Sequence, residues 1–164
     1  MNSDIQIVRD SVDEALHLLY ENDRYLIYNQ TKRSDRRDNH VSERGIVFRF
    51  GIYLDQICKK KKFFDSYNID TEYNRNFNGP KYLPNSPNGS FPDLIIHKRG
   101  SNEFNLLIVE FKTWWDNNNK TDIKKIEEFM DPNGKYGYKL GLSVILEKEK
   151  PVNKWVYKWI NGEK

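Results

Sequence analysis

Cysteine is almost absent from this sequence, which has one, Cys58, among 164 residues. A single thiol cannot form a disulfide within the chain, and a zinc site built on cysteines is excluded for the same reason. Long apolar runs are also missing: the longest purely aliphatic run is Leu106–Val109, whereas a membrane-spanning helix needs about 20 apolar residues. The polar segment Asn2–Asp10 lacks the apolar stretch of a secretory signal peptide. We therefore expect a cytoplasmic protein that does not bind membranes.

The residues that are present indicate a folded chain. Aromatic residues make up 14% of the sequence and charged residues 31%. Disordered chains are poor in aromatic residues, so we expect a core beneath a charged surface. The length suits a single domain, which we place over residues 1–164. The net charge of +3 permits a nucleic-acid partner without requiring one.

Apolar residues spaced three and four apart predict helices in three segments. The first covers residues 4–20. The second starts after Ser42, a favourable N-cap residue, and closes at Lys59–Lys62, where positive charge suits the negative end of the helix dipole. The third starts at Thr121 and ends at residues 131–134, where the sequence Asp-Pro-Asn-Gly stops a helix.

Strands are predicted between and after these helices. Polar and apolar residues alternate over 67–74, and two apolar runs, 91–97 and 105–113, are joined by a turn-like stretch and predict a hairpin. Residues 76–90 are rich in Asn, Gly and Pro and predict a long loop, and 140–146 predicts a further strand. From the second helix onward the order is helix, strand, strand, strand, helix, strand. The hairpin is apolar on both faces, so helices must cover both sides of an α/β sheet.

The register of this hairpin brings charged side chains together. If Asp93 stands opposite Glu110, then Leu94 faces Val109 and apolar residues meet along the whole hairpin. The two carboxylates then lie at the same end and on the same face of the sheet. Because side chains alternate along a strand, Lys112 returns to that face two residues after Glu110.

Two carboxylates at one sheet edge repel each other unless a positive charge lies between them. A divalent cation provides it, and hard oxygen ligands suit Mg²⁺. Glu43 lies four residues before Val47 and therefore on the apolar stripe of the second helix. A glutamate that faces a core needs a partner, and the same cation would be one. Glu43 could instead simply complement the helix dipole in the first turn.

These residues carry a resemblance to a known family. The segments Phe91-Pro92-Asp93 and Glu110-Phe111-Lys112 resemble the signature of the PD-(D/E)xK nuclease superfamily, and short bacterial members are the most similar. The superfamily has a restriction-endonuclease-like α-β-β-β-α-β core, in which a mixed central sheet is flanked by helices. The resemblance covers about residues 40–147 and leaves the first predicted helix as an N-terminal addition.

The resemblance also implies roles for the residues of the site. Asp93 and Glu110 would bind Mg²⁺ or, as a substitute, Mn²⁺, Phe111 would add its backbone carbonyl, and Glu43 would complete the metal shell. Lys112 would assist the attacking water. The implied activity is metal-dependent hydrolysis of phosphodiester bonds. DNA is the favoured substrate, although nothing in the sequence reads a 2′-hydroxyl and RNA stays open. The alternative is a non-catalytic nucleic-acid-binding or assembly subunit on the same fold.

Further residues are candidates for contact with a substrate or partner. Arg75 and Lys125 are candidate phosphate contacts, although a solvated helix face is the favoured interpretation of Lys125. The basic runs at 32–37 and 59–62 are further candidates on the same grounds. A chain of this length has little room for a separate target-reading domain, so sequence-specific cleavage would need a homodimer or a partner specificity subunit.

Two residues outside the motif are more ambiguous. Asp70 lies on the polar face of the first predicted strand, where it could extend the acidic pocket or remain solvated. His97 falls within the hairpin strand that starts near Asp93, and we expect it to be a buried, hydrogen-bonded histidine rather than a metal ligand.

Overall fold

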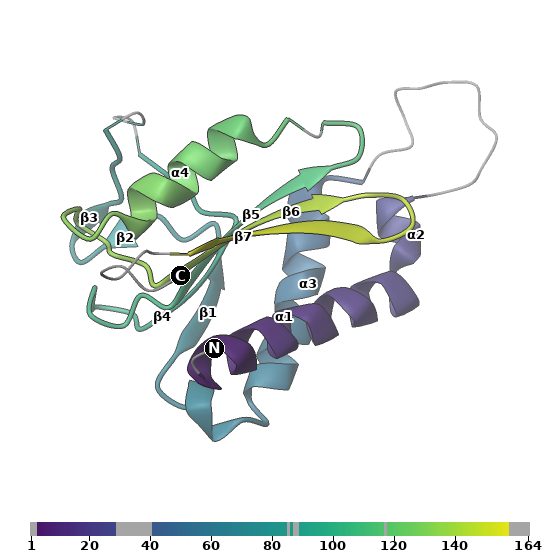
Figure 1. The fold of residues 1–164 in the computed structure, drawn as a ribbon, viewed down its shortest axis with the longest axis horizontal. Helices are drawn as coiled ribbons and strands as arrows, with labels where there is room; N and C mark the ends of the chain where they lie inside the picture. Colours follow the sequence, from purple (N-terminus) through teal and green to yellow (C-terminus); the bar gives the residue numbers. More distant parts are fainter. Residues whose placement is uncertain (1–2, 29–40, 85, 87–88, 117, 158–164) are drawn as a thin grey trace.

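The computed structural model describes residues 3–28, 41–84, 86, 89–116 and 118–157. It is a mixed α/β structure with a five-stranded mixed sheet between helices (Figure 1). The described helices are α1 (Ser3–Asn22), α2 (Arg24–Ile27), α3 (Glu43–Cys58) and α4 (Lys120–Met130), with a short 3-10 helix at Lys62–Phe64. None of the helices in these ranges combines the length and the apolar character needed to cross a membrane. The predicted basic run at 32–37 lies outside the described residues.

The main sheet has the strand order β1-β4-β5-β6-β7. Its strands are β1 (Asn68–Thr71), β4 (Leu94–His97), β5 (Leu107–Thr113), β6 (Leu140–Leu146) and β7 (Pro151–Tyr157). Strands β5 and β6 are parallel, and the other neighbouring pairs are antiparallel. The parallel pair needs a crossover, which is α4. The element order α3, β1, β4, β5, α4, β6 agrees with the order expected from the sequence, apart from a small additional hairpin.

The predicted hairpin register is confirmed: Leu94 pairs with Val109, and the two following pairs are also as expected. Strand β4 nevertheless begins at Leu94 and not at residue 91. The residue before Asp93 is Pro92, which has no N–H to donate to a ladder. Asp93 therefore lies immediately before the strand, and its side chain stays free to bond elsewhere.

The sheet has a separate core on each face. Leu107, Val109 and Phe111 on β5 pack with apolar residues of α1 and α3. The alternate residue Ile108 belongs instead to the core on the other face, with Ile126 and Phe129 of α4. Figure 1 shows α1 and α3 on one side of the sheet and α4 on the other. Because side chains alternate along a strand, Glu110 and Lys112 share the face of Ile108, under α4.

Two segments differ from the sequence-based expectation. Strand β1 ends at Thr71 rather than at residue 74, because Glu72 adopts a left-handed backbone with φ 52° and breaks the alternation. The segment predicted as an uninterrupted loop, 76–90, takes part in a two-stranded hairpin of β2 (Arg75–Asn76) and β3 (Gly79–Pro80).

Candidate active site

Asp93 is anchored to the strand that carries Glu110 and Lys112. Its Oδ2 accepts a hydrogen bond of 2.7 Å from the backbone N–H of Phe111, the residue between them. The Phe111 side chain points to the opposite face, where its ring centroid lies 5.1 Å from that of Phe50. This hydrogen bond links the residue before β4 to β5. It holds three predicted site residues, Asp93, Glu110 and Lys112, at the same end of the sheet.

Glu110 is buried beneath α4, with 3% of its surface exposed. Its Oε2 accepts a hydrogen bond of 2.8 Å from Lys125 Nζ. Its Oε1 is buried and has no hydrogen-bond partner in the described part of the chain. A buried carboxylate oxygen without a partner is costly, so this atom is suited to receive a further positive group.

Lys125 lies inside the site and not on a solvated helix face. Besides Glu110, it contacts the carbonyl oxygen of Phe91, which accepts a hydrogen bond of 2.7 Å from Nζ. The favoured interpretation of Lys125 as a residue on a solvated helix face is therefore wrong. Whether it contacts a phosphate stays a prediction.

Lys112 and Asp122 form a second pair across the same layer. Lys112 Nζ lies 3.4 Å from Asp122 Oδ2, an ion-pair distance, and this buried oxygen has no hydrogen-bond partner among the described residues. Burial opposes the charge of Lys112, but the carboxylates of Asp122, Glu43 and Asp93 outweigh it and raise the pKa of the ammonium. Strand β5 and helix α4 are thus joined by two crossed acid–lysine pairs.

Glu43, in the first turn of α3, is half-buried beside these pairs. Burial raises the pKa of its carboxyl to about 7; Lys112 opposes this rise, and the acids Asp93, Asp122 and Asp116 add to it. The structure thus brings Glu43 from the α3 layer to the predicted cluster. This placement favours the interpretation of Glu43 as a site residue over that of a mere dipole partner.

The cluster has more carboxyl groups than ammonium groups. Burial also raises the pKa of Asp93, against the Phe111 N–H bond and the two lysines. Burial, and then the Asp93 charge, raise the pKa of Glu110 well above its ordinary value. Three neighbouring carboxyls that all resist ionisation indicate a site that would gain from a cation.

The donor atoms of the cluster meet the needs of a divalent cation through two carboxylates. In the described ranges, no group of three or more His, Cys, Asp or Glu side chains lies close enough together to hold a metal ion. Asp93 and Glu110 still supply hard oxygen ligands, and the unpartnered Oε1 of Glu110 would be satisfied by one. The residues thus fit a cation held by two carboxylates, while Glu43 and the Phe111 carbonyl as further ligands stay predictions.

No family model, curated protein or solved structure matches this chain.

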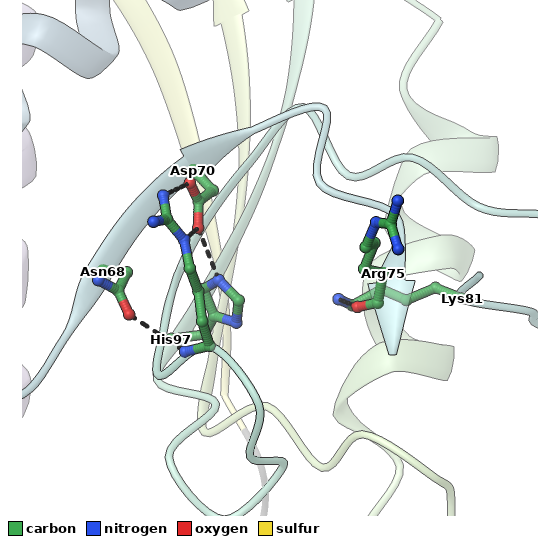
Figure 2. A network of polar contacts seen from close by, with 6 residues as sticks. Asn68, Asp70, Arg75, Lys81 and His97 are labelled. Atoms are coloured by element: carbon green, nitrogen blue, oxygen red, sulfur yellow. Dashed lines mark hydrogen bonds and ion pairs between the residues drawn. The ribbon is translucent and has the colours of Figure 1, made fainter. Parts of the chain in front are cut away.

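Arg75 and Asp70 lie apart from this cluster. Asp70 accepts hydrogen bonds of 2.9 Å from His97 Nε2 and 2.8 Å from Arg99 Nε, and it does not extend the acidic pocket (Figure 2). His97 is buried and hydrogen-bonded as predicted. Figure 2 shows the exposed Arg75 guanidinium directed away from Asp70, while the Arg75 carbonyl accepts a hydrogen bond from Lys81. The structure does not join Arg75 to the carboxylates, and its role as a phosphate contact stays a prediction.

Asp122 is the site residue that the sequence analysis missed. A signal was present, because Asp122 precedes Ile126 by four residues and Lys125 precedes Phe129 by four. Both therefore lie on the apolar, inward face of α4. The same spacing argument that selected Glu43 would have selected Asp122 and would have turned Lys125 inward.

Proposed function

We propose that this chain is a Mg²⁺-dependent nuclease of the PD-(D/E)xK type that hydrolyses phosphodiester bonds in DNA. The observation that carries the proposal is the hydrogen bond from the Phe111 N–H to Asp93 Oδ2. It fixes Asp93 against the Glu110-Phe111-Lys112 segment, so that the two carboxylates and the lysine of the motif lie at the same end of the sheet.

The fold supports this proposal at a coarser level. Helix α3 is followed by β1, β4, β5, α4 and β6, and the two strands around α4 are parallel. This is the helix and strand order of a restriction-endonuclease-like core, with α1 and β7 as additions. We propose that specific fold for residues 40–147.

Asp93 and Glu110 would hold the cation, and Mn²⁺ would serve as a substitute for Mg²⁺. When bound, such an ion lowers the pKa of a coordinated water and offsets the charge that builds on the phosphate during attack. The carboxylate of Glu110 is buried and that of Asp93 is partly buried, which strengthens any electrostatic contact they make. A bound cation would relieve the repulsion between these two carboxylates.

Lys112 would orient the attacking water and the phosphate as a hydrogen-bond donor. The surrounding carboxylates raise its pKa, so in the cation-free protein the side chain is an ammonium and cannot accept a proton. Asp122, 3.4 Å away, positions this ammonium. The lysine therefore contributes charge and orientation at the site.

A non-catalytic binding or assembly subunit remains the second candidate. Scaffolds of this kind keep the fold and lose the chemistry. The convergence of Asp93, Glu110 and Lys112 at one edge favours the enzyme, because a scaffold has no need for buried carboxylates that resist ionisation.

The test is a cleavage assay on plasmid DNA with Mg²⁺ and with EDTA. Asp93→Asn, Glu110→Gln and Lys112→Met should each lower the cleavage rate by a factor of about 10²–10⁴, with circular dichroism unchanged. The matched controls are the exposed residues Asp65 and Lys124, changed to Asn and Met. Cleavage by the Asp93→Asn protein at the parental rate would falsify the assignment.

A substrate panel refines the assignment. Linear, branched and single-stranded DNA are compared with RNA under the same conditions. We expect DNA to be cut faster than RNA. Specific cleavage of both strands would require a second copy of the chain or a partner, which sedimentation of the active species would detect. Equal cutting of RNA would contradict the preference for DNA.

A further inference from the structure

Two lysines meet the carboxylate cluster, and their partners differ. Lys112 pairs with Asp122 on α4, whereas Lys125 reaches down from α4 to Glu110. We propose that the Lys125 ammonium is a tethered counter-ion that holds Glu110 until a divalent cation takes its place. This inference rests on the proposed function and describes how the same site is kept ready for its cation.

Lys125 fits this role because it can leave, whereas Glu110 cannot. The Lys125 side chain is 22% exposed and that of Glu110 only 4%. Lys125 has a long, flexible stem at the rim of the site, while Glu110 lies within a paired strand. In an exchange of partners, the lysine is therefore the group that moves.

The contacts of Glu110 leave room for a stronger cation. Lys125 Nζ bonds to Oε2 at 2.8 Å, and Oε1 stays buried without a hydrogen-bond partner in the described chain. An ammonium is a point charge that satisfies one oxygen here, whereas a divalent ion carries twice the charge and can contact both oxygens. Divalent binding thus improves the environment of Glu110 at the expense of its pair with Lys125.

The released ammonium would remain beside the site. Lys125 Nζ also donates a hydrogen bond of 2.7 Å to the Phe91 carbonyl oxygen, two residues before Asp93. This second contact keeps the ammonium next to the cluster after its contact with Glu110 is broken. A substrate phosphate arriving there would meet a positive charge that the cation has freed.

The experiment measures the accessibility of the Lys125 amine in the intact protein. Purified chain is treated briefly with acetic anhydride in EDTA, in Mg²⁺, and in NaCl of matched ionic strength, and acetylation of each lysine is quantified by mass spectrometry. Mg²⁺ should accelerate Lys125 acetylation about tenfold, since one hydrogen bond to a charged group accounts for a factor of about 10 or more. The exposed neighbour Lys124 should react equally in all three buffers.

A variant and a binding measurement complete the design. In Glu110→Gln, Lys125 loses its ion-pair partner, so it should react fast in EDTA and show no further response to Mg²⁺. Calorimetric titration of the parent with Mg²⁺ reports binding without relying on cleavage. If Mg²⁺ binds and Lys125 acetylation is unchanged, the counter-ion role is wrong while the proposed function stands. If Mg²⁺ does not bind, both are wrong.

Discussion

At the scale of single residues, Asp70 shows how one carboxylate can be fully used for structure. It accepts hydrogen bonds from the buried His97 and from the fork of Arg99, which arrives from the turn after β4. The Asn68 side chain accepts a hydrogen bond from the Arg99 backbone N–H (Figure 2). Strand β1 is thereby fastened to the end of β4 by polar contacts.

Replacement of Asp70 should lower the free energy of unfolding. Asp70→Asn removes the charge that His97 and Arg99 share, and we expect a loss of about 1–3 kcal/mol at neutral pH. Thermal or urea unfolding of both proteins measures it. The control Asp65→Asn, at an exposed position, should stay within about 0.5 kcal/mol of the parent.

The pH dependence of this loss has a definite sign. Burial alone would raise the pKa of Asp70, but the bonds from His97 and Arg99 hold it well below its ordinary value. A carboxyl with a depressed folded-state pKa stabilises the protein above its unfolded-state pKa, and this contribution fades as the pH falls below about 4. The difference between parent and Asp70→Asn should therefore shrink in acid. A difference that stays constant down to pH 2 would contradict the assigned charge.

At the scale of elements, the fit of α4 over the sheet depends on a glycine in β6. A Cβ at Gly141 would lie 2.2 Å from Ile126 Cγ2 and 2.5 Å from Met130 Sδ. These distances leave no room for a methyl group, so the absence of a side chain lets the helix approach. The approach in turn brings Asp122 and Lys125 within reach of β5.

Gly141→Ala should therefore destabilise the protein and displace the site. We expect a loss of about 1–3 kcal/mol from overpacking and a fall in Mg²⁺-dependent cleavage, both measurable on one preparation. Gly79→Ala is the matched control, because a Cβ there meets no atom within 4 Å. Equal stability of the two alanine variants would show that α4 does not need this glycine.

The sequence predicted the main helices and strands, and every residue of the charged cluster except Asp122, for physical reasons that can be named. The hairpin register was predictable because the alignment with Asp93 opposite Glu110 pairs apolar residues along the strands, as the structure confirms. The end of β1 was not predictable, since the left-handed turn at Glu72 depends on tertiary contacts. The partners of Asp70 were equally hidden, because Arg99 folds back from a turn that has no periodicity.

At the scale of the whole molecule, the free energy of unfolding should depend on pH because of the buried residue Lys81. Lys81 is 2% exposed, and its ammonium lies 4.5 Å from the centroid of the Tyr73 ring. Burial lowers the pKa of this lysine to about 8, with Asp70 opposing the shift. The folded protein therefore binds the proton of Lys81 less tightly than the unfolded chain does.

The unfolding free energy should reflect this difference in alkaline buffer. Between pH 8 and about 10.4 the unfolded chain holds a proton that the folded protein has released, so stability rises with pH over that window. Below pH 8 the penalty of the buried charge is fully present. Lys81→Met should lack the rise, and subtracting its curve from that of the parent removes the titration of the tyrosines. A flat difference curve would contradict the burial of the ammonium.

The candidate site draws its side chains from layers on opposite faces of the sheet: Glu43 from α3, and Asp122 and Lys125 from α4. Either helix could detach by local opening while the strands stay paired. Such an opening would scatter the charged groups before the bulk of the molecule unravels. Cleavage activity would therefore appear late in folding and disappear early on heating. A cleavage assay would thus report the docking of both helices more sensitively than spectroscopy does.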